Sequence, residues 1–147
     1  MNLLDTVSSA ASFGEALAAI VRHFGADSGT VHFLAADGLL HLAAAEGLPP
    51  AMLPMIREIP VGKGMAGLAV ERRRPVDACN IQTDASGDVR PGAKATGLEG
   101  AIVVPIFRGD DVAGALGVAN RRERIFSAEE QDALIAAGRI LARLSAS

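Results

Sequence analysis

Residues 59–84 read IPVGKGMAGLAVERRRPVDACNIQTD, and they decide how this 147-residue chain folds. Gly62 and Gly64 permit a tight turn, because glycine adopts backbone conformations that other residues avoid. Apolar side chains then recur at helical spacing over residues 65–74, and a proline ends the helix. Residues 76–81 predict a strand. The stretch therefore predicts a glycine turn, a short helix and a strand in succession.

Two hairpin signals on either side of this stretch predict four further strands. An Asp-Gly turn lies between β-prone runs at residues 28–35 and 39–45, which is typical of an antiparallel hairpin. Residues 101–107 and 112–120 flank the tetrapeptide RGDD and predict a second hairpin. Both strands of this second hairpin are apolar at successive positions, so we expect helices to cover both faces of the sheet.

Helices are predicted at both ends of the chain from their capping residues. Ser12 and Glu15 form a capping box at the start of a helix that ends at Phe24. Ser127 and Glu130 form a second capping box at the start of the last helix. A short helix is also expected before residue 12. Each of the two capped helices carries an apolar stripe that can cover a sheet.

These elements predict a single domain over residues 1–147, of the α/β class and the α+β type. A central antiparallel sheet of five to six strands carries the terminal helices on one face. Short helices lie on the other face, one of them opened by the proline pair at residues 49–50. A long loop over residues 82–98 completes that layer. Loops of this length are typical of functional segments, so we expect it to cover a pocket.

Composition excludes several classes of function. The formal net charge is −3, so the chain lacks the basic surface of a nucleic-acid-binding protein, and no nucleic-acid partner is expected. No run reaches the ~20 apolar residues of a membrane span. The single cysteine, Cys79, excludes an internal disulfide framework and a cysteine-rich metal site. A soluble protein of the reducing cytoplasm, with no membrane contact, is therefore expected.

Residues 62–67 read GKGMAG and match the glycine pattern of dinucleotide-binding folds, with Asp84 about twenty residues further on. We reject that interpretation, because the preceding strand contains a proline and the hairpins describe an antiparallel sheet. A helix amino terminus next to glycines also suits a small anion. Two interpretations remain, an anionic ligand near residues 62–65 or glycines that only shape a tight turn.

The order of these elements resembles the GAF family of small-molecule sensor domains. The resemblance rests on the glycine turn, the helix ending before Pro75, the variable loop, VVP at residues 103–105, GALGV at 114–118 and Phe126-Ser127. It implies a ligand between the sheet and the layer of short helices and loop. The candidate ligand-binding residues that it implies are Gly64, Met65, Leu68, Asn80, Gln82, Asp84, Arg90, Lys94, Thr96 and Val103.

Members of this family that bind cyclic nucleotides carry a signature that is only partly present. Asn120-Arg121, Phe126 and Glu130-Gln131 occupy its positions, with the lysine and the Asp-Glu pair replaced. We expect Arg121 to pair with Glu129 or Glu130 and to brace the last helix. His32 and His41 are alternative haem ligands, although a strand histidine with a satisfied ring is the favoured interpretation.

An enzymatic alternative is a free methionine-R-sulfoxide reductase, which resembles this chain in being a single GAF domain. Aligned on GKGMAG and IVVPI, the positions of its reactive cysteines hold Ala66 and approximately Lys94. Its acidic substrate-binding positions fall on alanine and glycine, at residues 101, 117 and 119. Cys79 alone cannot supply both a nucleophile and a resolving thiol, which disfavours this alternative.

The sequence therefore predicts a non-catalytic sensor of an unidentified small molecule, with no cofactor and no metal. Its output would pass to a separate signalling protein or through a homodimer of terminal helices. The stripes expected to form that dimer consist of Val7, Leu17, Val21, Leu134, Leu141 and Leu144, and the same stripes can instead cover the sheet. A structural dimerisation module with a filled interior is the remaining alternative.

Overall fold

A computed structural model of the chain describes residues 2–84, 86, 88–89 and 96–145. It contains a six-stranded sheet in the order β3-β2-β1-β6-β5-β4, in which every pair is antiparallel. The strands are β1 (Ser28–Leu34), β2 (Leu39–Glu46), β3 (Glu58–Pro60), β4 (Val76–Ala78), β5 (Gly100–Arg108) and β6 (Asp111–Asn120). The predicted α+β class and the predicted antiparallel sheet are confirmed.

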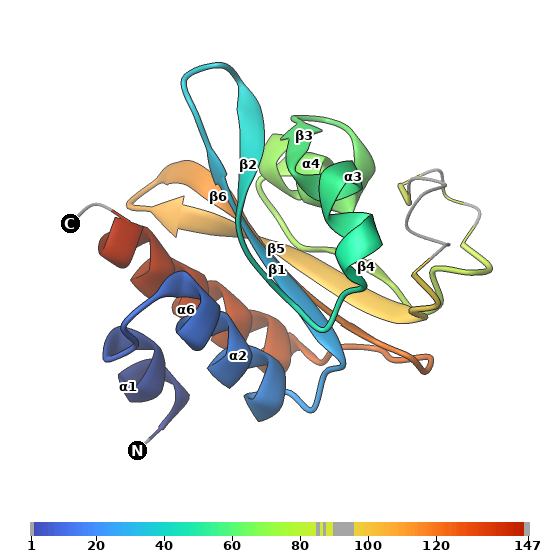
Figure 1. Cartoon of the computed structure of the whole chain (residues 1–147), viewed down its shortest axis with the longest axis horizontal. Helices are drawn as coiled ribbons and strands as arrows, with labels where there is room; N and C mark the ends of the chain where they lie inside the picture. The colour runs from blue at the N-terminus through green and yellow to red at the C-terminus, as the bar shows by residue number, and fades with distance from the viewer. Residues whose placement is uncertain (1, 85, 87, 90–95, 146–147) are drawn as a thin grey trace.

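Helices cover both faces of this sheet, as the apolar strands predicted (Figure 1). The helices on one face are α1 (Leu3–Ser8), α2 (Phe13–His23) and α6 (Ala128–Ser145). The short helices η1 (Pro50–Met52), α3 (Leu53–Ile56) and α4 (Gly64–Arg72) lie on the other face. The terminal helices and the short helices are thus separated by the sheet.

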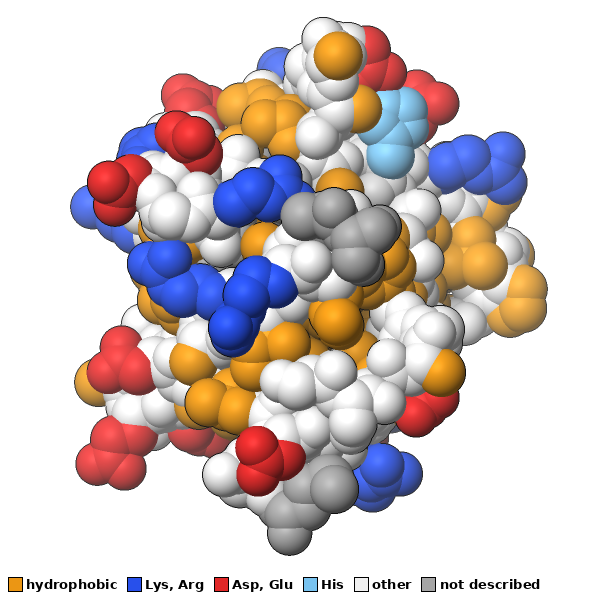
Figure 2. All heavy atoms as spheres, turned by 90° about the vertical axis from the view of Figure 1, so that its left-hand side faces the viewer, with side chains coloured by type: hydrophobic (Ala, Val, Ile, Leu, Met, Phe, Trp, Pro, Cys, Tyr) orange, Lys and Arg blue, Asp and Glu red, His pale blue; other side chains and the backbone are white. Residues whose placement is uncertain are grey.

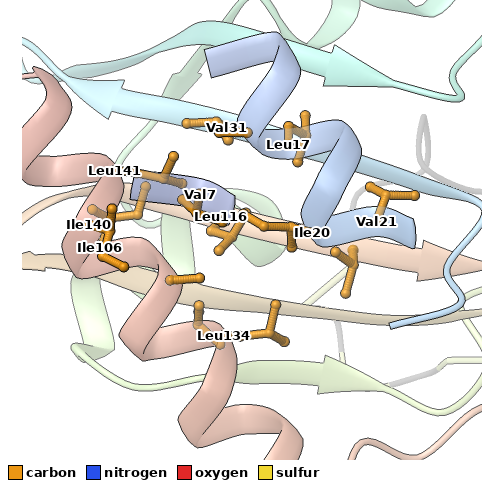
Figure 3. Close-up of a cluster of buried hydrophobic side chains, with 14 of the residues drawn as sticks. Val7, Leu17, Ile20, Val21, Val31, Ile106, Leu116, Leu134, Ile140 and Leu141 are labelled. Carbon is orange, nitrogen blue, oxygen red and sulfur yellow. The ribbon is translucent and has the colours of Figure 1, made fainter. Parts of the chain in front are cut away.

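The main core lies between the sheet and the terminal helices. In Figure 3, side chains of α2 and α6 such as Leu17 and Leu134 lie together with Val31, Ile106 and Leu116 of the sheet. Five of the six residues of the stripe predicted for a dimer are fully or almost fully buried in this core. That stripe therefore covers the sheet within one chain and is not available to a second copy.

Two predicted boundaries differ from the structure for local reasons. The helix expected over residues 65–74 ends at Arg72, because Arg73 adopts a left-handed conformation with φ of 58°. The strand expected over residues 76–81 ends at Ala78. Beyond it, the Asn80 side chain accepts a hydrogen bond from the Gln82 amide, and such local bonds replace the ladder. The described residues of loop 82–98 are neither helix nor strand.

The ion pair expected at the start of α6 involves a different arginine. Arg124, not Arg121, donates to the Glu130 carboxylate at 2.6 Å. The pKa of Glu130 is lowered, first by its hydrogen bond from the Ser127 amide and further by Arg124. Arg121 instead uses its backbone amide to donate to Asp27 at 2.6 Å. The prediction for Arg121 was wrong because it rested on a family signature and not on which arginine side chain can reach the Glu130 carboxylate.

Candidate ligand cavity

A cavity of about 170 Å³, partly open at the surface, lies between the sheet and the layer of short helices. Its walls come from β1, the segment after β2, α3, β3, α4, the segment before β5, and strands β5 and β6. The lining residues are Ser28, Gly29, Thr30, His32, Leu48, Ile56, Ile59, Ala66, Leu98, Ala101, Ile102, Val103, Gly117, Val118 and Ala119. Most of this wall is apolar, and no lining residue is acidic, lysine or arginine.

The floor of the cavity consists of small residues from adjacent strands. Gly117 of β6 pairs with Thr30 of β1 on one side and with Val103 of β5 on the other. A Cβ atom at Gly117 would lie 3.2 Å from a Val103 methyl group and 3.3 Å from the Thr30 hydroxyl. These separations are tight, so a side chain at position 117 would fill the space between Thr30 and Val103. Ala101 and Ala119 continue this floor of short side chains.

The roof comes from helices that glycine brings close to the sheet. A Cβ atom at Gly67 would lie only 2.4 Å from the Pro60 carbonyl oxygen, so only glycine lets α4 pack this closely on β3. Gly67 is thereby explained by packing and not by phosphate binding. Ala66 of α4 and Ile56 of α3 face the cavity from this layer.

The glycine stretch at residues 62–67 begins with a tight turn, which is one of the two structures that its sequence predicted. Gly62 adopts φ of 88°, and its amide donates to the Gly67 carbonyl at 2.9 Å. The amide of Lys63 donates to the Pro60 carbonyl at 3.2 Å. Gly62 and Lys63 thus use their amides inside the protein, which leaves fewer donors for an anion at the start of α4.

His32 is the one ionisable residue of the lining, and it is only 1% exposed. Its Nε2 atom lies 2.8 Å from the Ile56 carbonyl oxygen. Because a carbonyl oxygen only accepts, Nε2 carries the proton and donates. Burial lowers the pKa of His32, and the bond to Ile56 opposes this only in part, so the ring is neutral at pH 7. Nδ1 is buried without a hydrogen-bond partner among the described residues.

An irregularity in the neighbouring strand lies beside His32. Val31 pairs with Ala44 of β2, whereas His32 pairs with Leu42, so Ala43 is an extra residue opposite this point. Bulges of this kind bend a strand and change the direction of nearby side chains. The strand therefore departs from regular pairing where the buried histidine meets the cavity.

Of the eight described residues among the ten implied by the family resemblance, only Val103 is a lining residue of the cavity. Gly64 begins α4, Leu68 is half-buried on the same helix, and Met65 packs on a neighbouring apolar cluster with Ala101. Asp84 and Thr96 bond within the loop. Asn80 donates to Glu123, and Gln82 to the Leu98 carbonyl. Arg90 and Lys94 lie outside the described residues.

His41 and Cys79 do not line the cavity. His41 lies at the surface and its Nε2 is 2.7 Å from the Asp37 carboxylate, so the two histidines weighed as haem ligands occupy different surroundings. Cys79 is exposed and is not a lining residue. Among the described residues, no group of three or more His, Cys, Asp or Glu side chains is arranged to hold a metal ion.

The loop that follows β4 is attached to α4 by charge. Arg72 forms a two-pronged contact with Asp88, at 2.9 and 3.1 Å, and this contact lowers the pKa of Asp88. Next to it, Val89 is buried in a small apolar cluster with Leu98 and Ala101. The described part of the loop thus packs beside the cavity, where Leu98 is shared by the cluster and the cavity wall.

Most residues of the cavity floor were not among the predicted ligand-binding residues, because glycine and alanine carry no functional group. The available signal was the alternation of size in ALGVA at residues 115–119, where every second residue is small. In a strand, alternate residues face the same side, so this pattern predicts one face with little side-chain volume. It does not by itself tell whether other side chains fill the space.

The comparisons with known proteins agree with this architecture. A family model described as the GAF domain matches residues 8–144. The GAF domain of an Acinetobacter phosphoenolpyruvate-protein phosphotransferase is similar with a TM-score of 0.78 and 20% identity, covering 98% of this chain and 88% of that chain. The comparison with curated proteins gives no match.

Two reductases are also similar in structure. The free methionine-R-sulfoxide reductase of Neisseria meningitidis, solved with its substrate, gives a TM-score of 0.75 at 19% identity, covering 96% of this chain and 82% of that chain. The type II enzyme of Thermoplasma acidophilum gives 0.73 at 21%, with coverages of 97% and 94%. Identities this low show a shared fold.

No helix among the described residues has the length and apolar character that a bilayer crossing requires.

Proposed function

Because this chain belongs to the GAF domain family, we propose that it is a non-catalytic sensor domain that binds a small molecule between its sheet and its short helices. The observation that carries the proposal is the cavity of about 170 Å³, whose floor is kept open by Gly117, Ala101 and Ala119. This pocket is lined mainly by apolar side chains, and a molecule bound there would cover apolar surface that water otherwise contacts. The cavity therefore favours ligand binding over a structural module.

The reductase alternative is favoured by the similar enzymes and opposed by the position of sulfur. Thiol chemistry needs a thiolate beside the bound substrate and a second thiol to resolve the product. The position aligned with a reactive cysteine is Ala66, which lines the cavity without a reactive group. Cys79 is the only cysteine of the chain and it is exposed. Turnover of free methionine sulfoxide that depends on Cys79 and a reductant would contradict the sensor proposal.

We propose that the output passes through self-association or through a separate partner protein in the cytoplasm. Figure 2 shows the side of the molecule on which the C-terminus lies in Figure 1, with Lys and Arg side chains gathered near the centre beside hydrophobic ones. Arg139 of α6 donates to the Gly109 carbonyl in the β5–β6 turn, and Arg108 at the end of β5 donates to the Ala142 carbonyl of α6. Because the main stripe is buried, a dimer would have to use the remaining outer surface of these helices. Light scattering at several concentrations measures the oligomeric state.

The decisive experiment is native mass spectrometry of freshly purified protein, followed by thermal shifts with amino acids, nucleotides, anions and small aromatic compounds. We expect a retained molecule, or a compound that raises Tm, because a ligand that binds only the folded state stabilises it. Ala66→Leu places a larger side chain at the roof and should remove the Tm shift. Absence of any retained or stabilising compound would contradict the proposal.

A further inference from the structure

Two hydroxyl groups of β1 face the cavity. The residue between them, Gly29, faces the opposite side, because a Cβ atom there would lie 2.7 Å from Val21 and 3.0 Å from Leu17 of α2. Successive residues of a strand face opposite sides, so Ser28 and Thr30 point away from α2 and toward the short helices. Both are lining residues of the cavity. The alternation of β1 therefore places the two hydroxyls on the same wall.

Neither hydroxyl is used inside the described part of the protein. Among the described residues, the side chains of Ser28 and Thr30 form no hydrogen bond, and the only fully shielded side-chain polar atom without a partner is Nδ1 of His32. The two hydroxyls are therefore not fully shielded, although Ser28 as a whole is only 2% exposed. Polar groups in protein interiors nearly always have a partner, which here has to be water or a ligand.

The neighbouring strand leaves this part of the wall uncovered. Ser28 pairs with Ala119 of β6, and Thr30 pairs with Gly117. A Cβ atom at Gly117 would lie 3.3 Å from the Thr30 hydroxyl, so even a methyl group there would cover part of it. Small residues opposite the two hydroxyls thus keep them accessible from the cavity.

The rest of the described wall is apolar. His32 uses Nε2 to bind the Ile56 carbonyl, and the other lining residues are aliphatic or glycine. Pockets of this composition bind mainly through apolar contact, and a few polar groups fix the orientation of the ligand. A charged group beside the hydroxyls would lose its hydration without gaining an ion pair from the described lining, which is unfavourable. The wall therefore favours an uncharged group next to β1.

We propose that Ser28 and Thr30 determine the specificity of the cavity. Its ligand is an uncharged molecule whose apolar part covers the aliphatic wall and whose hydroxyl, carbonyl or N–H group forms a hydrogen bond with these side chains. The inference rests on the proposed function and specifies its ligand class. A hydroxyl both donates and accepts, so the pair can bind either kind of group. Since the hydroxyls serve a ligand and not the fold, their replacement should lower affinity and not stability.

The first test measures the Kd of benzyl alcohol, ethylbenzene and benzoate for the intact protein by NMR titration. Benzyl alcohol and ethylbenzene have nearly the same shape, but only the alcohol forms hydrogen bonds, and benzoate carries a negative charge. Thr30→Val replaces a hydroxyl with a methyl group, and Ser28→Ala removes the other hydroxyl. At least one variant should raise the Kd of the alcohol about fivefold, the effect of one hydrogen bond, without raising that of ethylbenzene.

The matched control is Thr6→Val, because Thr6 belongs to α1 on the other face of the sheet. It should leave both Kd values unchanged. Failure of benzyl alcohol to bind, an unchanged Kd for the alcohol in both variants, or tighter binding of benzoate than of the alcohol would overturn the inference. The sensor proposal survives each of these results, and it fails only if native mass spectrometry and the broader thermal panel are negative as well.

A second measurement needs no ligand. Thr30→Val should leave Tm unchanged or raise it, because valine is favoured in strands and the lost hydroxyl has no partner among the described residues. A clear fall in Tm would show that the Thr30 hydroxyl serves folding, and it would overturn the assignment of this hydroxyl to a ligand.

Discussion

The two faces of the sheet share the same strands but differ in the volume of the side chains that they present. On β6, Leu116 and Val118 point to the terminal helices and are buried in the main core. Ala115, Gly117 and Ala119 alternate with them and face the short helices. One strand thus forms part of a filled core on one side and of a cavity floor on the other. Cavity and core differ here in residue size and not in backbone geometry.

The adjacent strand repeats this difference. Ile102, Val104 and Ile106 of β5 belong to the main core, whereas Ala101 and Val103 face the cavity side. The helices that cover the two faces differ in length. The 18-residue helix α6 lies on the face with the main core, whereas the helices on the cavity face have three to nine residues. The filled face should therefore dominate stability, and the open face should respond to ligand.

The largest expected effect is on the filled face. Leu116→Ala should lower the free energy of unfolding by about 2–5 kcal/mol, because it removes a fully buried side chain and leaves a cavity in a packed core. Urea unfolding followed by circular dichroism measures this change. The control, Leu4→Ala, removes a side chain that is 38% exposed and should cost much less. A similar cost for both variants would contradict the division between the faces.

The next effect is the pH dependence that His32 gives to the open face. Its pKa is lowered in the folded state, so below its ordinary value of 6.5 the unfolded chain binds a proton that the folded chain does not. This contribution to stability is complete above pH 6.5 and is lost as the pH falls below it. The slope is at most about 1.4 kcal/mol per pH unit for one proton.

Urea unfolding between pH 7.5 and pH 5 measures this slope, and His32→Gln should flatten it. The lowered pKa values of Asp88 and Glu130 act in a different window, because their contributions are lost only as the pH falls below about 4.5. An equal slope in the wild type and the variant would show that another group titrates.

A smaller effect is expected from filling the cavity. Ala66→Leu should change stability by less than about 1 kcal/mol, since added apolar contacts offset any crowding. It should nevertheless abolish binding of small aromatic probes in calorimetry. The matched control, Ala43→Leu, places the same side chain at an exposed position of β2 and should leave binding unchanged. A loss of several kcal/mol with Ala66→Leu would mean that the face is already filled.

The smallest effect concerns the charge pair beside the cavity. Asp88→Asn removes the partner of Arg72, but both side chains are partly exposed and are well hydrated when separated. We expect a Tm within error of the wild type. Any difference should vanish at high salt, because salt screens such pairs. A large, salt-independent loss would show that this pair holds the loop more firmly than its exposure implies.

The fold could be predicted from the sequence because each element is specified locally. Ser12 and Ser127 accept hydrogen bonds from the amides of Glu15 and Glu130, at 3.1 Å in both cases, as the capping boxes predicted. The continuous apolar strands correctly required helices on both faces. Boundaries failed where a single residue changed the backbone, as at Arg73 with its left-handed conformation and at Asn80 with its side-chain bond to the Gln82 amide, because the apolar pattern used to place the ends of the elements does not register such changes.

The site was much less predictable, because a cavity is defined by what does not fill it. Val103 was identified from family position, whereas Gly117 and Ala119 were considered only as places where an enzyme would have acidic residues. His32 looked like an ordinary strand histidine in sequence. Its role depends on the carbonyl of Ile56, 24 residues away, and no local pattern encodes that contact.

The end of β6 links the two faces mechanically. Ala119 belongs to the cavity floor, and the next residue, Asn120, donates to the Gly25 carbonyl after α2 and accepts from Arg124. Arg124 in turn holds Glu130 in the first turn of α6. These hydrogen bonds connect the end of β6 to the C-terminal end of α2 and to the first turn of α6, so we expect a displacement of the floor to shift the ends of both helices.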